Sequence, residues 1–138
     1  MSQENVEIVR RMSDAFKRGD WAAATKPLHP AIEMDATRSP FAAKLGINRV
    51  YRGLAEVTGF WGEWLEAWGD QDWEEELIGA GDLVVMCARG HRLRGKGSGV
   101  EVDIPPYAWV QTLRDGKIVR ATFYVDKAEA LEAAGLSE

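Results

Sequence analysis

The chain has 138 residues, of which 46% are hydrophobic, and its formal net charge at pH 7 is −5. This length and apolar content suit one domain with its own hydrophobic core and argue against a disordered chain. The acidic balance argues against nucleic acid and anionic membranes as partners. There is neither an apolar signal sequence nor a stretch of about 18 apolar residues, so we expect a cytoplasmic protein. The sequence therefore predicts a single cytoplasmic domain over residues 1–138.

Helical signals dominate the first half of the chain. Apolar residues recur at helical spacing before Gly19 and again before Trp68, and Pro27 stops a short segment between them. The expected elements are helices over residues 3–18, 21–26 and 54–68, a short strand over 31–36, and a loop over 37–52.

Strand signals dominate the second half. Asp115-Gly116 is a typical two-residue hairpin turn, and Asp126 is a typical N-cap for a last helix that ends at Gly135. Gly90 and the pair Pro105-Pro106 fall inside long strands, where such residues indicate bulges or bends. The four expected strands cover residues 72–80, 82–94, 99–113 and 117–125. This order predicts an α+β domain with a bent sheet whose concave side leaves a cavity.

Six segments, in order, resemble the SnoaL-like polyketide cyclase family within the NTF2-like superfamily: LHPAIEMD, RSPFA with VYRG, FWGEWLEAW, RGKGSGVEV, LRDGKIVR and DKAEALEAAGL. The resemblance implies a cystatin-like cone. In this fold a curved, mixed and mostly antiparallel sheet wraps around three N-terminal helices, and a short helix follows at the C-terminus. It also implies a homodimer packed through outer sheet faces. The β-branched and aromatic residues on both faces of the last strand, with one alanine, favour the same assembly: Ile118, Val119, Ala121, Thr122, Phe123 and Tyr124.

Six tryptophans in so short a chain are unusual. They either fill a core and an interface or form the wall of a pocket for a flat apolar ligand, and both readings can hold. A ligand cavity of roughly 300 Å³ or more is expected. Its expected lining is Met12, Phe16, Tyr51, Trp61, Trp64, Met86, Tyr107, Trp109, Gln111 and Phe123.

Asp35 is the first candidate for catalysis, because it follows the first strand at the position where related steroid isomerases carry their base. A carboxylate at the mouth of an apolar cavity has a raised pKa and suits proton transfer. The alternative is that Asp35 caps the following loop beside Arg38. The isomerases also need two donors for an oxyanion, and their positions fall on Met12 and Trp109 here. Ketosteroid isomerisation is therefore disfavoured, since each donor contributes about 3 kcal/mol.

His91 is the second candidate, because the cyclases of this family rely on a His and an Asp in the cavity. If the hairpin turns at Gly97-Ser98, paired positions sum to 195, and His91 pairs with Ile104 on the face opposite Trp109. That register favours a surface or dimer-face position for His91, and a one-residue bulge at Gly90 or Pro105-Pro106 would reverse it.

The same register pairs Arg92 with Asp103. These two either form a screened surface salt bridge or, if they lie inside the cone, orient a polar ligand. No spacing typical of a metal site is present, so we expect no metal and no cofactor.

The sequence thus predicts a homodimeric SnoaL-like protein that binds a small, largely apolar molecule, with aromatic and polycyclic ligands included. Proton-transfer chemistry without a cofactor is compatible with this reading. The alternative is a non-catalytic ligand-binding or dimerisation module whose pocket is filled by tryptophan.

Overall fold

The computed structural model describes residues 2–38, 49–68 and 71–136. Within these ranges the expected helices are present as α1 (Ser2–Lys17), α2 (Trp21–Thr25), α4 (Leu54–Ala67) and α5 (Lys127–Ala133). Asp20 caps α2 by accepting a hydrogen bond from the backbone of Ala23, and Asp126 caps α5 by accepting one from Glu129. None of the described helices is long and apolar enough to cross a membrane.

The strands form one seven-stranded sheet, in which β1 and β7 run parallel and the other paired strands run antiparallel. Their order is β2-β1-β7-β6-β4-β3, and β5 pairs with β4. The bounds are β1 Leu28–Asp35, β2 Val50–Arg52, β3 Asp72–Ala80, β4 Leu83–Arg94, β5 Glu101–Ile104, β6 Tyr107–Arg114 and β7 Lys117–Tyr124.

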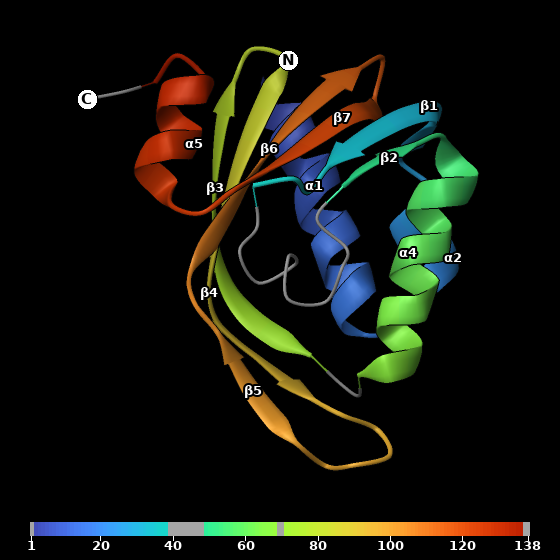
Figure 1. Ribbon diagram of the computed structural model, residues 1–138. Helices are drawn as coiled ribbons and strands as arrows, with labels where there is room; N and C mark the ends of the chain where they lie inside the picture. The colour runs from blue at the N-terminus through green and yellow to red at the C-terminus, as the bar shows by residue number, and fades with distance from the viewer. Residues whose placement is uncertain (1, 39–48, 69–70, 137–138) are drawn as a thin grey trace.

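The sheet separates two layers of helices. Figure 1 shows α1, α2 and α4 on one side of the curved sheet and α5 on the other. The main core lies under α1 and α4, where Val9, Met34 and Val57 are almost fully buried. A smaller core joins Ala130 of α5 to Val85 and Val110 on the opposite sheet face. The α+β cone predicted from the sequence is confirmed.

Two expected elements differ from the structure. The loop expected over 37–52 contains the short strand β2, and residues 39–48 of that loop lie outside the described part of the chain. The strand expected over 99–113 is two strands, β5 and β6. Pro105-Pro106 divides them, because proline has no N–H to give to a ladder.

The strand register is as predicted, but the side-chain face of β4 beyond Gly90 is not. Met86 pairs with Trp109, Ala88 with Tyr107 and His91 with Ile104, as expected. However, Glu74 pairs with Arg89 while Asp72 pairs with Arg92, so three residue steps of β4 oppose two of β3. The additional residue is a β-bulge at Gly90, whose φ of 69° suits glycine.

The bulge changes which residues face the helices. Before it the inward residues of β4 are Val84, Met86 and Ala88, and after it they are His91 and Leu93. His91 is therefore 5% exposed and lies on the cavity side, and the surface position favoured from the sequence is wrong.

A second register shift occurs in β7. Thr112 pairs with Arg120 but Leu113 pairs with Ile118, which leaves Val119 as the additional residue. Ile118 therefore shares the cavity side with Ala121 and Phe123 instead of facing outward with Tyr124.

Candidate functional site

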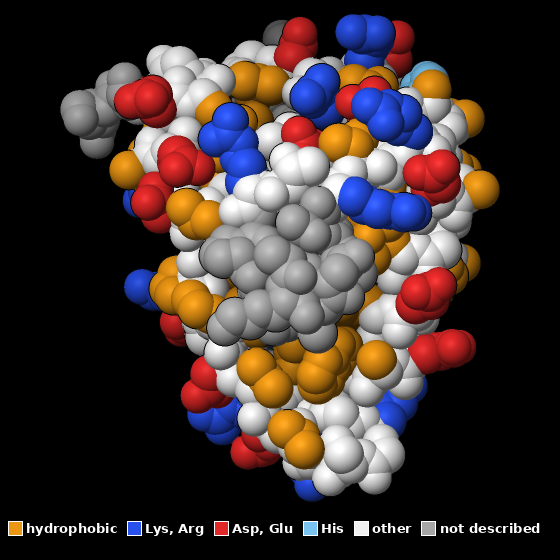
Figure 2. Space-filling model, viewed as in Figure 1, with side chains coloured by type: hydrophobic (Ala, Val, Ile, Leu, Met, Phe, Trp, Pro, Cys, Tyr) orange, Lys and Arg blue, Asp and Glu red, His pale blue; other side chains and the backbone are white. Residues whose placement is uncertain are grey.

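The candidate site is a cavity of about 210 Å³ between the concave side of the sheet and helices α1, α2 and α4. This volume is below the roughly 300 Å³ expected from the sequence. Figure 2 shows hydrophobic side chains gathered over the space between sheet and helices. Of the ten predicted pocket residues, nine line the cavity: Met12, Phe16, Trp61, Trp64, Met86, Tyr107, Trp109, Gln111 and Phe123.

Tyr51 is the predicted pocket residue that is not among the described lining residues. It is 4% exposed and packs in the core, where its ring lies 4.9 Å from that of Phe60. The Arg49 guanidinium lies 4.5 Å from the centroid of the same ring. Tyr51 thus packs in the core against Phe60, which itself lines the cavity.

Aromatic rings form a connected part of the cavity wall. Phe16 and Trp61 meet edge to face at 5.1 Å, and Trp109 and Phe123 do the same at 5.1 Å. Trp61 connects the two pairs, because its ring lies 6.5 Å from Trp109. Such contacts hold large side chains in fixed orientations, so the wall keeps its shape without a ligand.

A chain of hydrogen bonds lies at one end of the cavity. Trp64 Nε1 donates to Gln71 Oε1 at 3.2 Å, and the same oxygen lies 2.8 Å from His91 Nε2. His91 Nδ1 lies 2.8 Å from the Tyr107 hydroxyl. An indole nitrogen can only donate, so the Gln71 atom between Trp64 and His91 is the carbonyl oxygen.

This arrangement fixes the positions of the protons. Since Gln71 Oε1 accepts, His91 Nε2 carries a hydrogen and His91 Nδ1 offers a lone pair. The Tyr107 hydroxyl therefore donates to Nδ1, and its oxygen presents lone pairs to its surroundings. Sequence reasoning identified His91 and Tyr107 but missed Gln71, which lies in the segment between α4 and β3 and carries no motif.

Both titratable groups of the pair are neutral at physiological pH. Burial, together with the positive charge of Lys17, lowers the pKa of His91 to about 4, although the negative charge of Asp72 acts in the opposite direction. Burial, together with the negative charge of Glu75, raises the pKa of Tyr107 well above its ordinary value. The pair is thus an uncharged hydroxyl–imidazole couple in an apolar wall.

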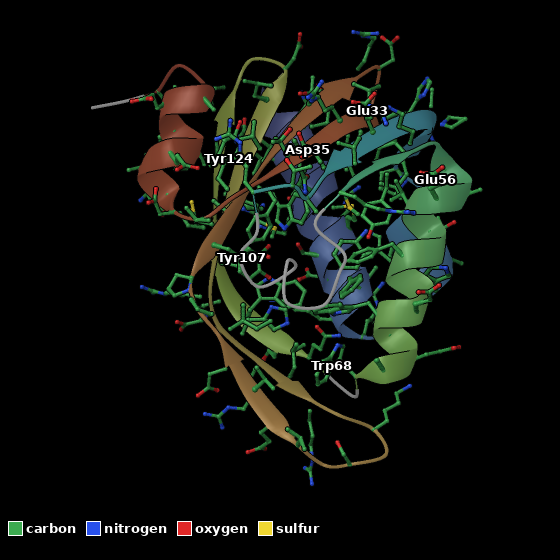
Figure 3. The ribbon with its side chains drawn as sticks, viewed as in Figure 1. Glu33, Asp35, Glu56, Trp68, Tyr107 and Tyr124 are labelled. Carbon is green, nitrogen blue, oxygen red and sulfur yellow. The ribbon has the colours of Figure 1, made fainter. Side chains whose placement is uncertain are left out.

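Asp35 is not part of this arrangement. Met34 in β1 and Ala36 directly after the strand are buried and line the cavity, so Asp35 between them faces the other way. Its Oδ1 accepts hydrogen bonds from the backbone of Thr37 at 3.0 Å and from the Thr37 hydroxyl at 2.6 Å. Figure 3 shows Asp35 at the end of β1 and Tyr107 at the start of β6, separated from each other.

The expectation of a raised pKa for Asp35 is wrong. Partial burial acts to raise this pKa, but the Thr37 hydrogen bonds and the charges of Arg120 and Arg38 outweigh it and leave the pKa below its usual value. Asp35 has the loop-capping role that was the alternative.

Arg92 and Asp103 form the predicted cross-strand pair, with 2.7 Å between Nε and Oδ1. Their side chains are 62% and 76% exposed, which makes this a surface salt bridge rather than part of the cavity. Among the described residues no group of three or more His, Cys, Asp or Glu side chains is placed to hold a metal ion.

The curved sheet, the helices on its concave side and the apolar cavity between them define an α+β protein of the NTF2-like class. The SnoaL-like domain model matches residues 9–121, so the chain belongs to the SnoaL-like domain family. A search of curated protein sequences gives no match.

Solved structures agree with the fold. An NTF2-like protein of unknown function from Burkholderia pseudomallei superimposes with a TM-score of 0.74 at 22% identity, covering 96% of this chain and 97% of the other. TerC co-crystallized with polyporic acid gives 0.72 at 21% identity, covering 96% and 98%. An NTF2-like protein from Burkholderia xenovorans gives 0.70 at 20% identity, covering 97% and 98%.

Proposed function

We propose that this protein binds a small, largely apolar and flat molecule in the cavity and transfers a proton to or from it through Tyr107 and His91, without a cofactor. The observation that carries the proposal is the hydroxyl–imidazole couple, which is buried in a largely apolar wall. A lone catalytic couple in an apolar cavity is a typical setting for proton transfer.

The step balances as a proton relay. As the C–H or O–H proton of the ligand passes to the Tyr107 oxygen, the Tyr107 hydroxyl proton passes to His91 Nδ1. The products are an anionic ligand, a neutral tyrosine and an imidazolium whose Nε2 proton still contacts Gln71. Afterwards Tyr107 donates to the anion that it has just created, which stabilises the charge.

An exchange reaction tests the proposal without knowledge of the natural substrate. The probe is 2-tetralone, an uncharged bicyclic ketone with acidic C–H groups, in deuterated buffer at pH 7. We expect deuterium incorporation, followed by NMR, to be faster than in buffer alone. Tyr107→Phe and His91→Gln should each slow the protein-dependent rate by about 10²-fold or more, which is the usual contribution of a positioned acid–base group.

Asp35→Asn is the matched control, since Asp35 faces away from the cavity. Its exchange rate should equal that of the wild-type protein. Exchange no faster than buffer, or exchange unaffected by the Tyr107 and His91 variants, would refute the relay.

A second candidate is a binding module without catalysis. The small cavity volume favours it, because tryptophan side chains occupy much of the space that a larger ligand needs. In that case 2-tetralone shifts the indole signals in NMR spectra but exchanges at the buffer rate.

We also propose that the chain forms a homodimer in the cytoplasm. Support comes from the family resemblance and from partly exposed apolar side chains beside α5 on the outer sheet face: Ile78, Leu83 and Tyr124. Sedimentation at micromolar concentration should give twice the monomer mass of 15.3 kDa, with an interface on the order of 1,000 Å² or more. A monomeric mass at that concentration would contradict the dimer.

A further inference from the structure

Gln111 is a buried amide that the hydrogen-bond chain does not use. It lies on β6, is 5% exposed and lines the cavity. Its Oε1 has no hydrogen-bond partner among the residues that the structure describes. Most buried polar atoms in native proteins are paired, and an unpaired one costs free energy, so this position calls for an explanation.

The residues paired with Gln111 across the sheet do not supply a hydrogen-bond partner. Its neighbours across the sheet are Val84 on β4 and Ala121 on β7, both apolar and short. Every second residue of a strand points to the same face, so Tyr107, Trp109 and Gln111 share the inward face of β6. Gln111 and Tyr107 are four residues apart, which is roughly 13 Å along a strand.

The absence of charged side chains among the described lining residues limits which ligand group can pair with Gln111. None of the described lining residues is Lys, Arg, Asp or Glu. A carboxylate or ammonium group on the ligand would lose its hydration without meeting an opposite charge, which is strongly unfavourable. The polar atom that pairs with Gln111 must therefore belong to an uncharged group.

We propose that Gln111 is a specificity-determining residue that selects uncharged aromatic ligands carrying a hydroxyl or amide N–H, which donates to its side-chain oxygen while the ring lies against Trp109. This inference rests on the proposed function, since it assumes that the cavity takes a ligand. It adds the ligand class: hydrogen-bond donors are preferred over bare hydrocarbons, and carboxylates are excluded.

The test compares three probes of one ring size: 2-naphthol, naphthalene and 2-naphthoate. Titration followed through the tryptophan indole N–H signals gives the dissociation constants. We expect the wild-type protein to bind 2-naphthol about tenfold or more tightly than naphthalene, the range of one recovered buried hydrogen bond. The carboxylate 2-naphthoate should bind at least tenfold more weakly than 2-naphthol.

Gln111→Met is the informative variant, because methionine has a similar length and no amide. It should bind naphthalene as well as the wild-type protein does and should lose the preference for 2-naphthol. It should also unfold at an equal or higher temperature, whereas a purely structural Gln111 would make the variant less stable. Ser13→Ala is the matched control. Ser13 lines the cavity but its hydroxyl already contacts Met86 Sδ at 3.6 Å, so the preference should remain.

The outcomes separate the two proposals. If no probe shifts the indole signals, the proposed binding function is refuted. If all three probes bind but 2-naphthol shows no preference, or if Gln111→Met keeps the preference, the role of Gln111 is refuted while the cavity remains a binding site.

Discussion

Lowering the pH from 7 to 4 should destabilise the folded protein through His91, and His91→Gln should remove this part of the pH dependence. The pKa of His91 is about 4 in the folded protein, against 6.5 for an ordinary histidine. Between these two values the unfolded chain binds a proton that the folded protein does not bind. Stability therefore falls as the pH decreases through this window and levels off below it.

The expected size is roughly 2–3 kcal/mol, since one pKa unit corresponds to about 1.4 kcal/mol. The groups that face His91 are Tyr107 from β6, Lys17 from α1, Gln71 from the segment before β3, and Asp72 at the start of β3. Of these, Lys17 adds to the effect of burial and Asp72 opposes it.

Urea unfolding at a series of pH values measures this effect. Carboxylates also titrate near pH 4, so the informative quantity is the difference between wild-type and variant free energies of unfolding. That difference should shrink by roughly 2–3 kcal/mol between pH 7 and 4 for His91→Gln. His29→Gln is the matched control, because His29 lies outside the cavity and contacts the backbone of Ala31. Parallel curves for wild type and His91→Gln would show that His91 is not buried in its neutral form.

The fold and much of the pocket could be predicted because they depend on local signals. The hairpin turn near Gly97 sets the pairing of β4 with β5 and β6, and every pair follows from it at a fixed sum of residue numbers. Alternation along β6 then places Tyr107, Trp109 and Gln111 on one face. Helical spacing does the same for Trp61 and Trp64 on α4.

The positions that could not be predicted follow bulges or lie between elements. A bulge reverses the inward face of everything beyond it, and a glycine or proline in a strand indicates only that a bulge is possible in that place. This is why His91 was assigned to the wrong face although its partner was correct. Asp35 lies one position away from the residues that face the cavity, because its neighbours Met34 and Ala36 are the ones that point inward. Gln71 is identified only by its contacts with Trp64 and His91.

Replacing Gly90 with valine should damage the site far more than replacing it with alanine. A β-branched side chain strongly disfavours the left-handed conformation of Gly90, whose φ is 69°. Without the bulge β4 pairs step for step with β3, and regular alternation then turns His91 and Leu93 outward. This change exposes Leu93, which is now fully buried, and breaks both hydrogen bonds of His91. We expect Gly90→Val to cost more than about 3 kcal/mol of unfolding free energy, from the lost apolar burial and the unpaired polar groups.

Gly90→Ala is the matched control, because alanine tolerates the positive φ better than the β-branched valine does. An added Cβ meets no atom within 4 Å, so its cost comes only from the positive φ and should be about 1 kcal/mol. His91 should keep its pKa near 4 in Gly90→Ala, whereas in Gly90→Val NMR titration should show the pKa moving toward 6.5. If Gly90→Val costs no more than Gly90→Ala and His91 still titrates near 4, the bulge is not what places His91 in the cavity. The expected contrast would instead show that the backbone conformation of one residue in β4 decides whether His91 meets Tyr107.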